Sequence, residues 1–214
     1  MMKKLHTGKL ISEYLIRNKW QFAAAFVCVF VGVFAGTVYA AALKGQPAEA
    51  MNGYLKNFVS AYNLQSVNRK DIFSFSVYNN IKTVLFMWLS GLWVYFLPVG
   101  AVQLFAKGCK LGFSTSVFVR IFGLKGIFFA FLAALPQLVA IIPFMTVYYA
   151  ININFALSLN RIKNGRSSRC SKNEIYIKNL LYLLAAVFVA VLAAVVDAFV
   201  MPPVLKPVCF LLNS

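Results

Sequence analysis

Acidic residues are scarce in this sequence, and histidine is almost absent. The 214 residues include five Asp or Glu and one His, against 21 Lys or Arg. Hydrolysis by paired carboxylates and catalysis by a histidine-based triad both need groups that are in short supply here. We therefore expect that the chain is not an enzyme and that it has no catalytic residues.

Cysteine is also sparse, and its spacing matches no known kind of metal or redox site. The four cysteines are Cys28, Cys109, Cys170 and Cys209, and no two of them form a C-x-x-C pair. The sequence also lacks the H-E-x-x-H, G-x-S-x-G and P-loop patterns. We expect no disulfide framework, no metal and no cofactor.

Apolar residues, in contrast, are abundant. They make up 61% of the chain, and the mean hydropathy is +0.76. A water-soluble fold of this length has too little interior to bury them, so the composition predicts an all-α, polytopic integral membrane protein. The net charge of +16 also raises the question of nucleic-acid binding, but the cations lie in short clusters between apolar runs. We expect no nucleic-acid partner.

The apolar runs predict a bundle of about five transmembrane helices. Runs long enough to cross the hydrocarbon of a bilayer lie at residues 21–43, 81–106, 126–151 and 179–200. Residues 108–122 are short for a span, so they form either a third span or a re-entrant segment. Pro136 and Pro143 interrupt the run at 126–151, and their freed carbonyl groups need partners, which favours a place inside the bundle.

The first apolar run follows a basic segment, residues 1–20. The run is longer than the apolar core of a secretory signal, so we expect an uncleaved anchor helix, with cleavage near Ala40 as the alternative. Within this run, Gly32 and Gly36 are four residues apart, a spacing that permits close helix packing. Their partner is either another helix of the same chain, which we favour, or a second copy in a homo-oligomer.

Residues 44–80 form the most polar loop between predicted spans. Its apolar residues follow a helical period and are Met51, Tyr54, Leu55, Phe58, Val59 and Tyr62. Such an amphipathic helix covers the membrane surface, caps the bundle or receives a partner, and capping is the favoured reading. Residues 72–78 form either a short extended piece or the serine-capped start of the next helix.

The distribution of cations predicts the orientation in a bacterial cell membrane, because Lys and Arg are enriched in cytoplasmic loops. The segment 1–20, the residues Lys107 and Lys110, and the basic loop at 152–178 should lie in the cytoplasm. The N-terminus is then cytoplasmic, and the loop at 44–80 and the tail at 201–214 are extracytoplasmic.

Asp197 is the one informative acid, because it falls near the end of a predicted span. A carboxylate at membrane depth is unfavourable unless it faces the bundle interior or water. Asp197 is either an ion or proton site, or a structural group bonded to Asn79, Asn80 or the helical hairpin that we predict at residues 107–151. Because no second acid accompanies Asp197, the structural interpretation is favoured.

Several short motifs occur together in a fixed order. They are Asn79-Asn80, Lys107-Gly108-x-x-Leu111-Gly112-Phe113, Leu135-Pro136-Gln137, Ile141-Ile142-Pro143 and Asp197-Ala198-Phe199. In this order, and with five predicted spans, the chain resembles the stage II sporulation protein M family over roughly residues 70 to 203. Asp197 stands where that family usually carries glutamate, which keeps the charge.

The resemblance implies a membrane scaffold that acts during engulfment in endospore formation. Members of that family hold two peptidoglycan-degrading partners, the stage II sporulation proteins D and P, at the septal membrane. On this basis we expect Tyr54, Phe58 and Tyr62 to contribute to partner contact. The motif residues expected to shape the bundle are Asn79, Asn80, Gly108, Gly112, Pro136, Pro143 and Asp197.

The sequence is also compatible with two other functions. One is a permease subunit of a transporter that works with a separate ATPase, docked near the basic loop between Arg161 and Lys178. The other is a purely structural assembly protein that oligomerises through Gly32 and Gly36. In each case membrane lipid surrounds the chain.

Overall fold

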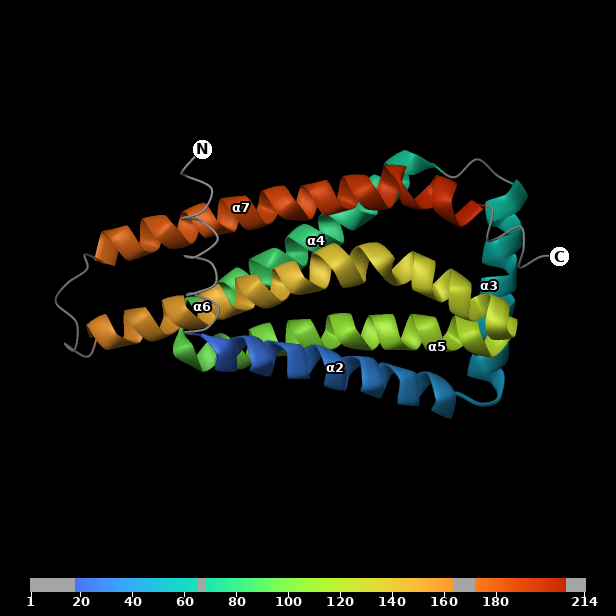
Figure 1. The fold of residues 1–214 in the computed structure, drawn as a ribbon, viewed down its shortest axis with the longest axis horizontal. Helices are drawn as coiled ribbons and strands as arrows, with labels where there is room; N and C mark the ends of the chain where they lie inside the picture. Colours follow the sequence, from blue (N-terminus) through green and yellow to red (C-terminus); the bar gives the residue numbers. More distant parts are fainter. Residues whose placement is uncertain (1–17, 65–67, 164–171, 207–214) are drawn as a thin grey trace, which may run out of the picture.

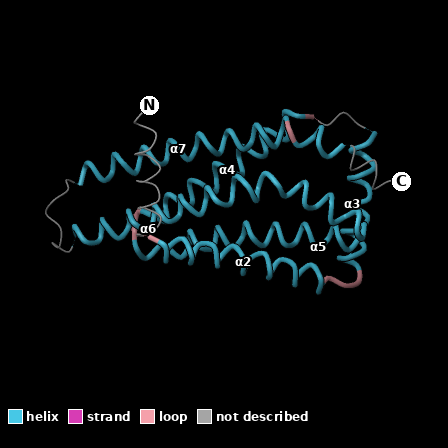
Figure 2. The backbone as a smooth tube through the Cα atoms, viewed as in Figure 1, coloured by secondary structure: helices cyan, strands magenta, loops and turns pink. Residues whose placement is uncertain are grey.

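The structure is a computed structural model, and it describes residues 18–64, 68–163 and 172–206. In these residues all regular structure is helical, as the sequence predicts (Figures 1 and 2). The α-helices are α2 (Lys19–Ala42), α3 (Gln46–Leu64), α4 (Arg69–Gly91), α5 (Leu97–Pro136), α6 (Ile142–Lys163) and α7 (Lys172–Phe199). A short 3-10 turn, η1 (Val94–Phe96), precedes α5, and a π-helical segment, η2 (Gln137–Ile141), separates α5 from α6.

The long helices lie side by side in an elongated bundle, and α3 lies across one end of it (Figure 1). Four helical stretches of the described chain are long and apolar enough to cross a membrane: Lys19–Ala42, Val94–Leu135, Ile142–Lys163 and Asn173–Lys206. α4 is more polar and is not among them, yet it runs within the same bundle and packs against α5, α6 and α7. The integral membrane class follows from these stretches.

The predicted span at 81–106 is corrected by the structure. α4 ends at Gly91, and α5 begins at Leu97, so the chain reverses direction inside that range. Pro98 is the second residue of α5, where its missing N–H has no helical partner to lose, so it starts a helix and does not kink one. Trp93 and Tyr95 are 64% and 94% exposed at this turn, as amphipathic rings at a membrane surface would be.

A second reversal lies at Gly123, inside the range assigned to α5. Its backbone angles, φ 57° and ψ −135°, belong to a region that only glycine adopts easily. Figure 1 shows the chain turning back here, beside α3. Residues 108–122 are therefore the second half of an arm that begins at Leu97, and the return arm runs from residue 124 through α6.

The two prolines of the return arm flank the π-helical segment. Pro136 ends α5 and Pro143 is the second residue of α6. Proline at 143 cannot donate a backbone hydrogen bond, and a π-helical turn is one of the known ways to absorb such a defect. Ile141, Ile142 and Met145 beside it are buried, so this part of the arm lies inside the bundle, as expected.

The predicted loop at 152–178 is shorter than expected. α6 continues to Lys163 and α7 begins at Lys172, while residues 164–171 lie outside the described chain. Asn152 is fully buried in α6 and donates to the carbonyl oxygen of Met87 at 3.2 Å. This hydrogen bond joins α6 to the last turns of α4.

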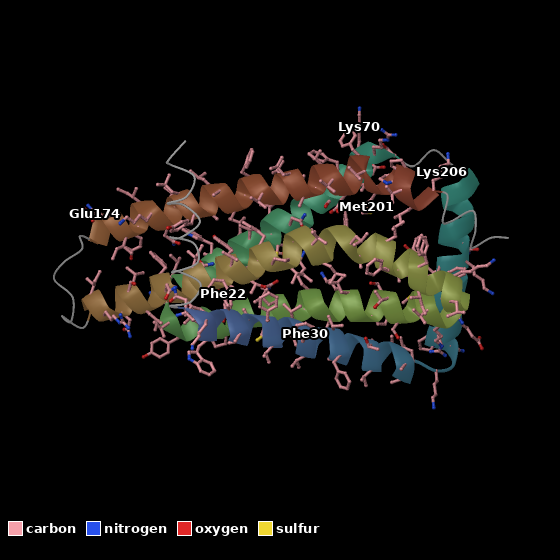
Figure 3. All side chains as sticks on the ribbon, viewed as in Figure 1. Phe22, Phe30, Lys70, Glu174, Met201 and Lys206 are labelled. Carbon is pink, nitrogen blue, oxygen red and sulfur yellow. The ribbon has the colours of Figure 1, made fainter. Side chains whose placement is uncertain are left out.

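The outside of the bundle is largely apolar, although Lys82 of α4 and Lys110 of α5 are also exposed. Phe30 is 69% exposed in the middle of α2, whereas the labelled charged residues Glu174, Lys70 and Lys206 lie towards the two ends of the molecule (Figure 3). An apolar belt between charged ends matches the cross-section of a bilayer.

Candidate functional site

Four polar side chains from three helices form a continuous hydrogen-bonded chain. Ser76 Oγ in α4 donates to Asp197 Oδ2 in α7 at 2.6 Å. Asn80 Nδ2 donates to Ser76 Oγ, and Lys107 Nζ in α5 donates to Asn80 Oδ1, both at 3.4 Å. We call Ser76, Asn80, Lys107 and Asp197 the polar network.

Local helix geometry brings the members of the polar network together. Ser76 and Asn80 are four residues apart and therefore lie on one face of α4. α7 approaches that face through a ridge of small residues, and Ala194 and Ala198 on either side of Asp197 are both fully buried. The short side chains place the carboxylate within reach of Ser76.

The start of α4 corrects the expectation for residues 72–78. Asn68 is the N-cap, and its side chain accepts from Lys70 N at 3.2 Å. The helix therefore begins at Arg69, and Ser76 lies two turns inside it. A serine in that place is free to bond another helix.

The network carries one positive and one negative charge. Asn80 is 3% exposed, and Lys107 and Asp197 are both half-buried. Lys107 lies within electrostatic range of both Lys110 and Asp197, although it reaches the carboxylate by hydrogen bonds only through Asn80 and Ser76. Charged groups at membrane depth are tolerated when they face the interior of the bundle and have polar partners there. The arrangement can lock α4, α5 and α7 together, and it can also bind or pass a proton.

A small cavity of about 160 Å³ adjoins the network. Asn80 lines it, and the remaining lining side chains, from η2, α6 and α7, are apolar. No group of three or more His, Cys, Asp or Glu side chains that could hold a metal occurs in residues 18–64, 68–163 and 172–206.

Glycines make the closest helix contact, between α2 and α5. A Cβ atom on Gly32 would collide with the carbonyl oxygen of Phe105, and one on Gly36 with that of Cys109. In return, a Cβ atom on Gly108 or Gly112 would collide with carbonyl groups of α2. The four glycines, which we call the glycine interface, thus face a helix of their own chain.

α3 covers the end of the bundle at which α2 finishes. Leu55 is buried against Ala40 and Val117, and Met51 packs beside it, while Tyr54 is 67% exposed. The side chains of Phe58 and Tyr62 lie outside the described part of the structure. Part of the apolar stripe therefore caps the bundle, and Tyr54 remains open to a partner.

Arg120 forms hydrogen bonds at the end of the bundle that α3 covers. Its guanidinium donates to the carbonyl oxygens of Leu43 at 2.7 Å and Ala40 at 3.4 Å. These carbonyls end α2, where the helix has no further N–H groups to offer them. Arg120 thus takes the place of a helix cap.

The sequence motifs fall partly on the polar network and partly on the glycine interface. Asn80 and Asp197 join the polar network, with Ser76 between them, and Gly108 and Gly112 belong to the glycine interface. Asn79 lies outside the network, and its backbone carbonyl accepts from Thr83. Pro136 and Pro143 flank η2.

Sequence reasoning missed Ser76 and Lys107 as network members. Lys107 was expected at the cytoplasmic end of a span, but it lies ten residues inside α5. The available signals were a serine four residues before Asn80 and a cation within an apolar run. Neither signal identifies its partner.

Comparison with known proteins gives one match. The family model described as stage II sporulation protein M matches residues 25–202. That range includes the polar network, the glycine interface and α3. No curated protein and no solved structure matches the chain.

Proposed function

Because the chain belongs to the stage II sporulation protein M family, whose model matches residues 25–202, we propose that it is the membrane scaffold of the engulfment complex. As a sporulation membrane protein, it would hold peptidoglycan-degrading partners, the stage II sporulation proteins D and P, at the septal membrane. The partners would perform the chemistry, and this chain would supply the anchor and the docking surface.

The observation that carries the proposal is the position of α3. It lies across the end of the bundle opposite to the end of α6 and the start of α7 (Figure 1). These helix ends flank the basic loop, with Arg161 and Lys163 in the last turn of α6, and such a loop favours the cytoplasmic side. α3 would then face the cell wall, where peptidoglycan is degraded. Its exposed Tyr54 is the kind of aromatic side chain that anchors protein interfaces.

A capture experiment with paired tyrosine variants tests the proposal. Tyr54→Ala should lower recovery of the two partners from gently solubilised membranes, because a central aromatic contact contributes about 2 kcal/mol or more, or about thirtyfold in affinity. Tyr95→Ala removes a tyrosine that is even more exposed, at the opposite end, and should leave recovery unchanged. Phe58→Ala tests the second residue of the predicted contact in the same way.

Membrane levels of each variant serve as the control for folding. If Tyr54→Ala and Phe58→Ala both capture the partners at the wild-type level, α3 is not the docking surface. If no peptidoglycan-degrading enzyme is recovered with the wild-type chain, the scaffold proposal itself fails.

The polar network favours one second candidate, the permease subunit of a transporter. A Lys and an Asp linked at membrane depth are typical of proton and ion pathways. An ATPase in the same eluate, in place of wall enzymes, would support that function. Asp197→Asn would then abolish transport while leaving the complex assembled.

A further inference from the structure

A second cavity lies between α6 and α7, near the ends that flank residues 164–171. It has a volume of about 210 Å³. Ser158 and Tyr182 contribute hydroxyl groups to its lining, and Ile151 and Phe155 contribute apolar surface. It is separate from the polar network and from the glycine interface, and neither the resemblance nor the proposed function uses it.

Asn179 is the unexplained group in this cavity. The residue is 2% exposed, and its side-chain oxygen has no hydrogen-bond partner among the described residues. A buried polar atom left in this state is destabilising, and a water, an ion or a ligand can supply the missing bond. An amide oxygen needs a donor, such as a hydroxyl or an ammonium group.

Lys178 gives the cavity its charge. This exposed side chain is part of the cavity lining, and no acidic side chain lies in that lining. Arg161 and Lys163 lie at the same end of the bundle, on the last turn of α6. The site therefore combines an anion-attracting cation with a buried acceptor that lacks a donor.

The outer surface around the cavity is lipid-facing. Leu180 and Leu181 are 52% and 59% exposed beside Asn179, so an occupant can enter sideways from the bilayer with its acyl chains still in lipid. Basic pockets between transmembrane helices on the cytoplasmic side are known to bind anionic headgroups.

We propose that this cavity binds the headgroup of an anionic phospholipid, with phosphatidylglycerol as the occupant. Lys178 pairs with the phosphate, and a glycerol hydroxyl donates to the amide oxygen of Asn179. Phosphatidylglycerol carries both groups, whereas phosphatidylcholine has neither a net charge nor a headgroup donor. The lipid would join the cytoplasmic ends of α6 and α7, independently of any protein partner.

Native mass spectrometry of the purified full chain tests the proposal. The protein is mixed with phosphatidylglycerol, phosphatidylethanolamine or phosphatidylcholine, and retained lipid is counted as the collision energy rises. Wild type should retain phosphatidylglycerol most strongly. Lys178→Gln should weaken retention about fivefold, the contribution of one lysine near an anionic headgroup. Asn179→Leu should reduce the selectivity over phosphatidylcholine to the part that the charge of Lys178 supplies.

Matched variants separate the cavity from general charge effects. Arg161→Gln removes a cation at the same end, and Asn173→Leu removes an exposed amide from α7, and neither residue lines the cavity. Both should retain phosphatidylglycerol as wild type does. Equal retention of phosphatidylglycerol and phosphatidylcholine by wild type would overturn the proposal.

Three further outcomes also overturn it. One is stronger retention of phosphatidylethanolamine, which would make the occupant zwitterionic. Another is full competition by soluble glycerol phosphate, which would show that the acyl chains are not part of recognition. The third is unchanged retention in Lys178→Gln, a substitution at an exposed position that should not disturb folding.

Discussion

The structural role of Asp197 depends on Ser76, a residue 121 positions earlier in the chain. Its carboxylate accepts a short hydrogen bond from Ser76, and the bond links α7 to α4. Hydrogen bonds to charged groups stabilise a fold more than neutral ones do. The network therefore supplies a polar link among α4, α5 and α7 in addition to their apolar contacts.

Removing either partner of this bond should destabilise the bundle. We expect Asp197→Ala to lower the free energy of unfolding by about 1.5–3 kcal/mol, the range for a hydrogen bond to a charged group. Ser76→Ala should lower it by a similar amount, and the double variant should be little worse than either single one. Unfolding in mixed micelles measures all three.

Ser74→Ala is the matched control, because Ser74 is exposed on the same helix. It should leave stability unchanged. Additive losses in the Ser76 and Asp197 variants would show that the two side chains do not depend on one another.

At the scale of the helix, glycines allow the backbones of α2 and α5 to approach closely. Gly32 and Gly36 of α2 face Gly108 and Gly112 of α5, and each site lacks room for even one methyl group. In lipid no hydrophobic force drives helices together, so close packing of this kind provides much of the attraction.

A methyl group in the glycine interface should therefore separate α2 from α5. We expect Gly32→Ala to destabilise the chain by about 1–3 kcal/mol, the usual effect of overpacking. Gly53→Ala, on α3, has open space around it and should be neutral or stabilising by up to about 1 kcal/mol, since alanine favours helix.

The same pair of variants tests the oligomer alternative. The protein mass from light scattering, after subtraction of the bound detergent, should show the same oligomeric state for wild type and both variants. Loss of an oligomer in Gly32→Ala without loss of stability would place this face at a contact between copies.

The reversal at Gly123 makes a separate prediction for the arms of α5. Gly123→Ala must hold a side chain at φ 57° and ψ −135°, which should cost about 1–3 kcal/mol of stability. Nothing lies within 4 Å of the added Cβ, so the loss would come from the backbone alone. A melting temperature equal to that of wild type would mean that the turn is not needed in this form.

The two ends of the molecule carry different helices and different charged residues. α3, Arg120 and Lys206 lie at one end, and the start of α7, with Glu174, lies at the other (Figures 1 and 3). The end at which α6 finishes also carries Arg161 and Lys163. Because cations occur at both ends, the expected orientation depends on the basic segment 1–20 and the basic loop at 152–178, which the positive-inside rule predicts to be cytoplasmic.

Cysteine labelling tests this orientation. In a background with Cys170 and Cys209 replaced by serine, Lys206→Cys should react with a membrane-impermeant maleimide in intact cells. Glu174→Cys should react only after the membrane is permeabilised. The background without an added cysteine measures labelling of Cys28 and Cys109, and the reverse pattern would invert the topology.

The class of this protein and its family can both be inferred from the amino-acid sequence alone. The amount of apolar residue, the spacing of cations and the order of the Gly, Pro and Asn motifs are properties of composition and local spacing, so they can be read without coordinates. The helical membrane fold and the family resemblance, which the match over residues 25–202 bears out, follow from such properties.

Which helices pack together, and where the chain turns, could be learned from the three-dimensional structure alone. The turn at Leu92–Phe96 is built from apolar residues, so a hydropathy pattern runs through it. Lys107 looks like the end of a span until Asn80 is placed opposite it. The bond between Ser76 and Asp197 depends on the register of two distant helices, and no local pattern encodes that register.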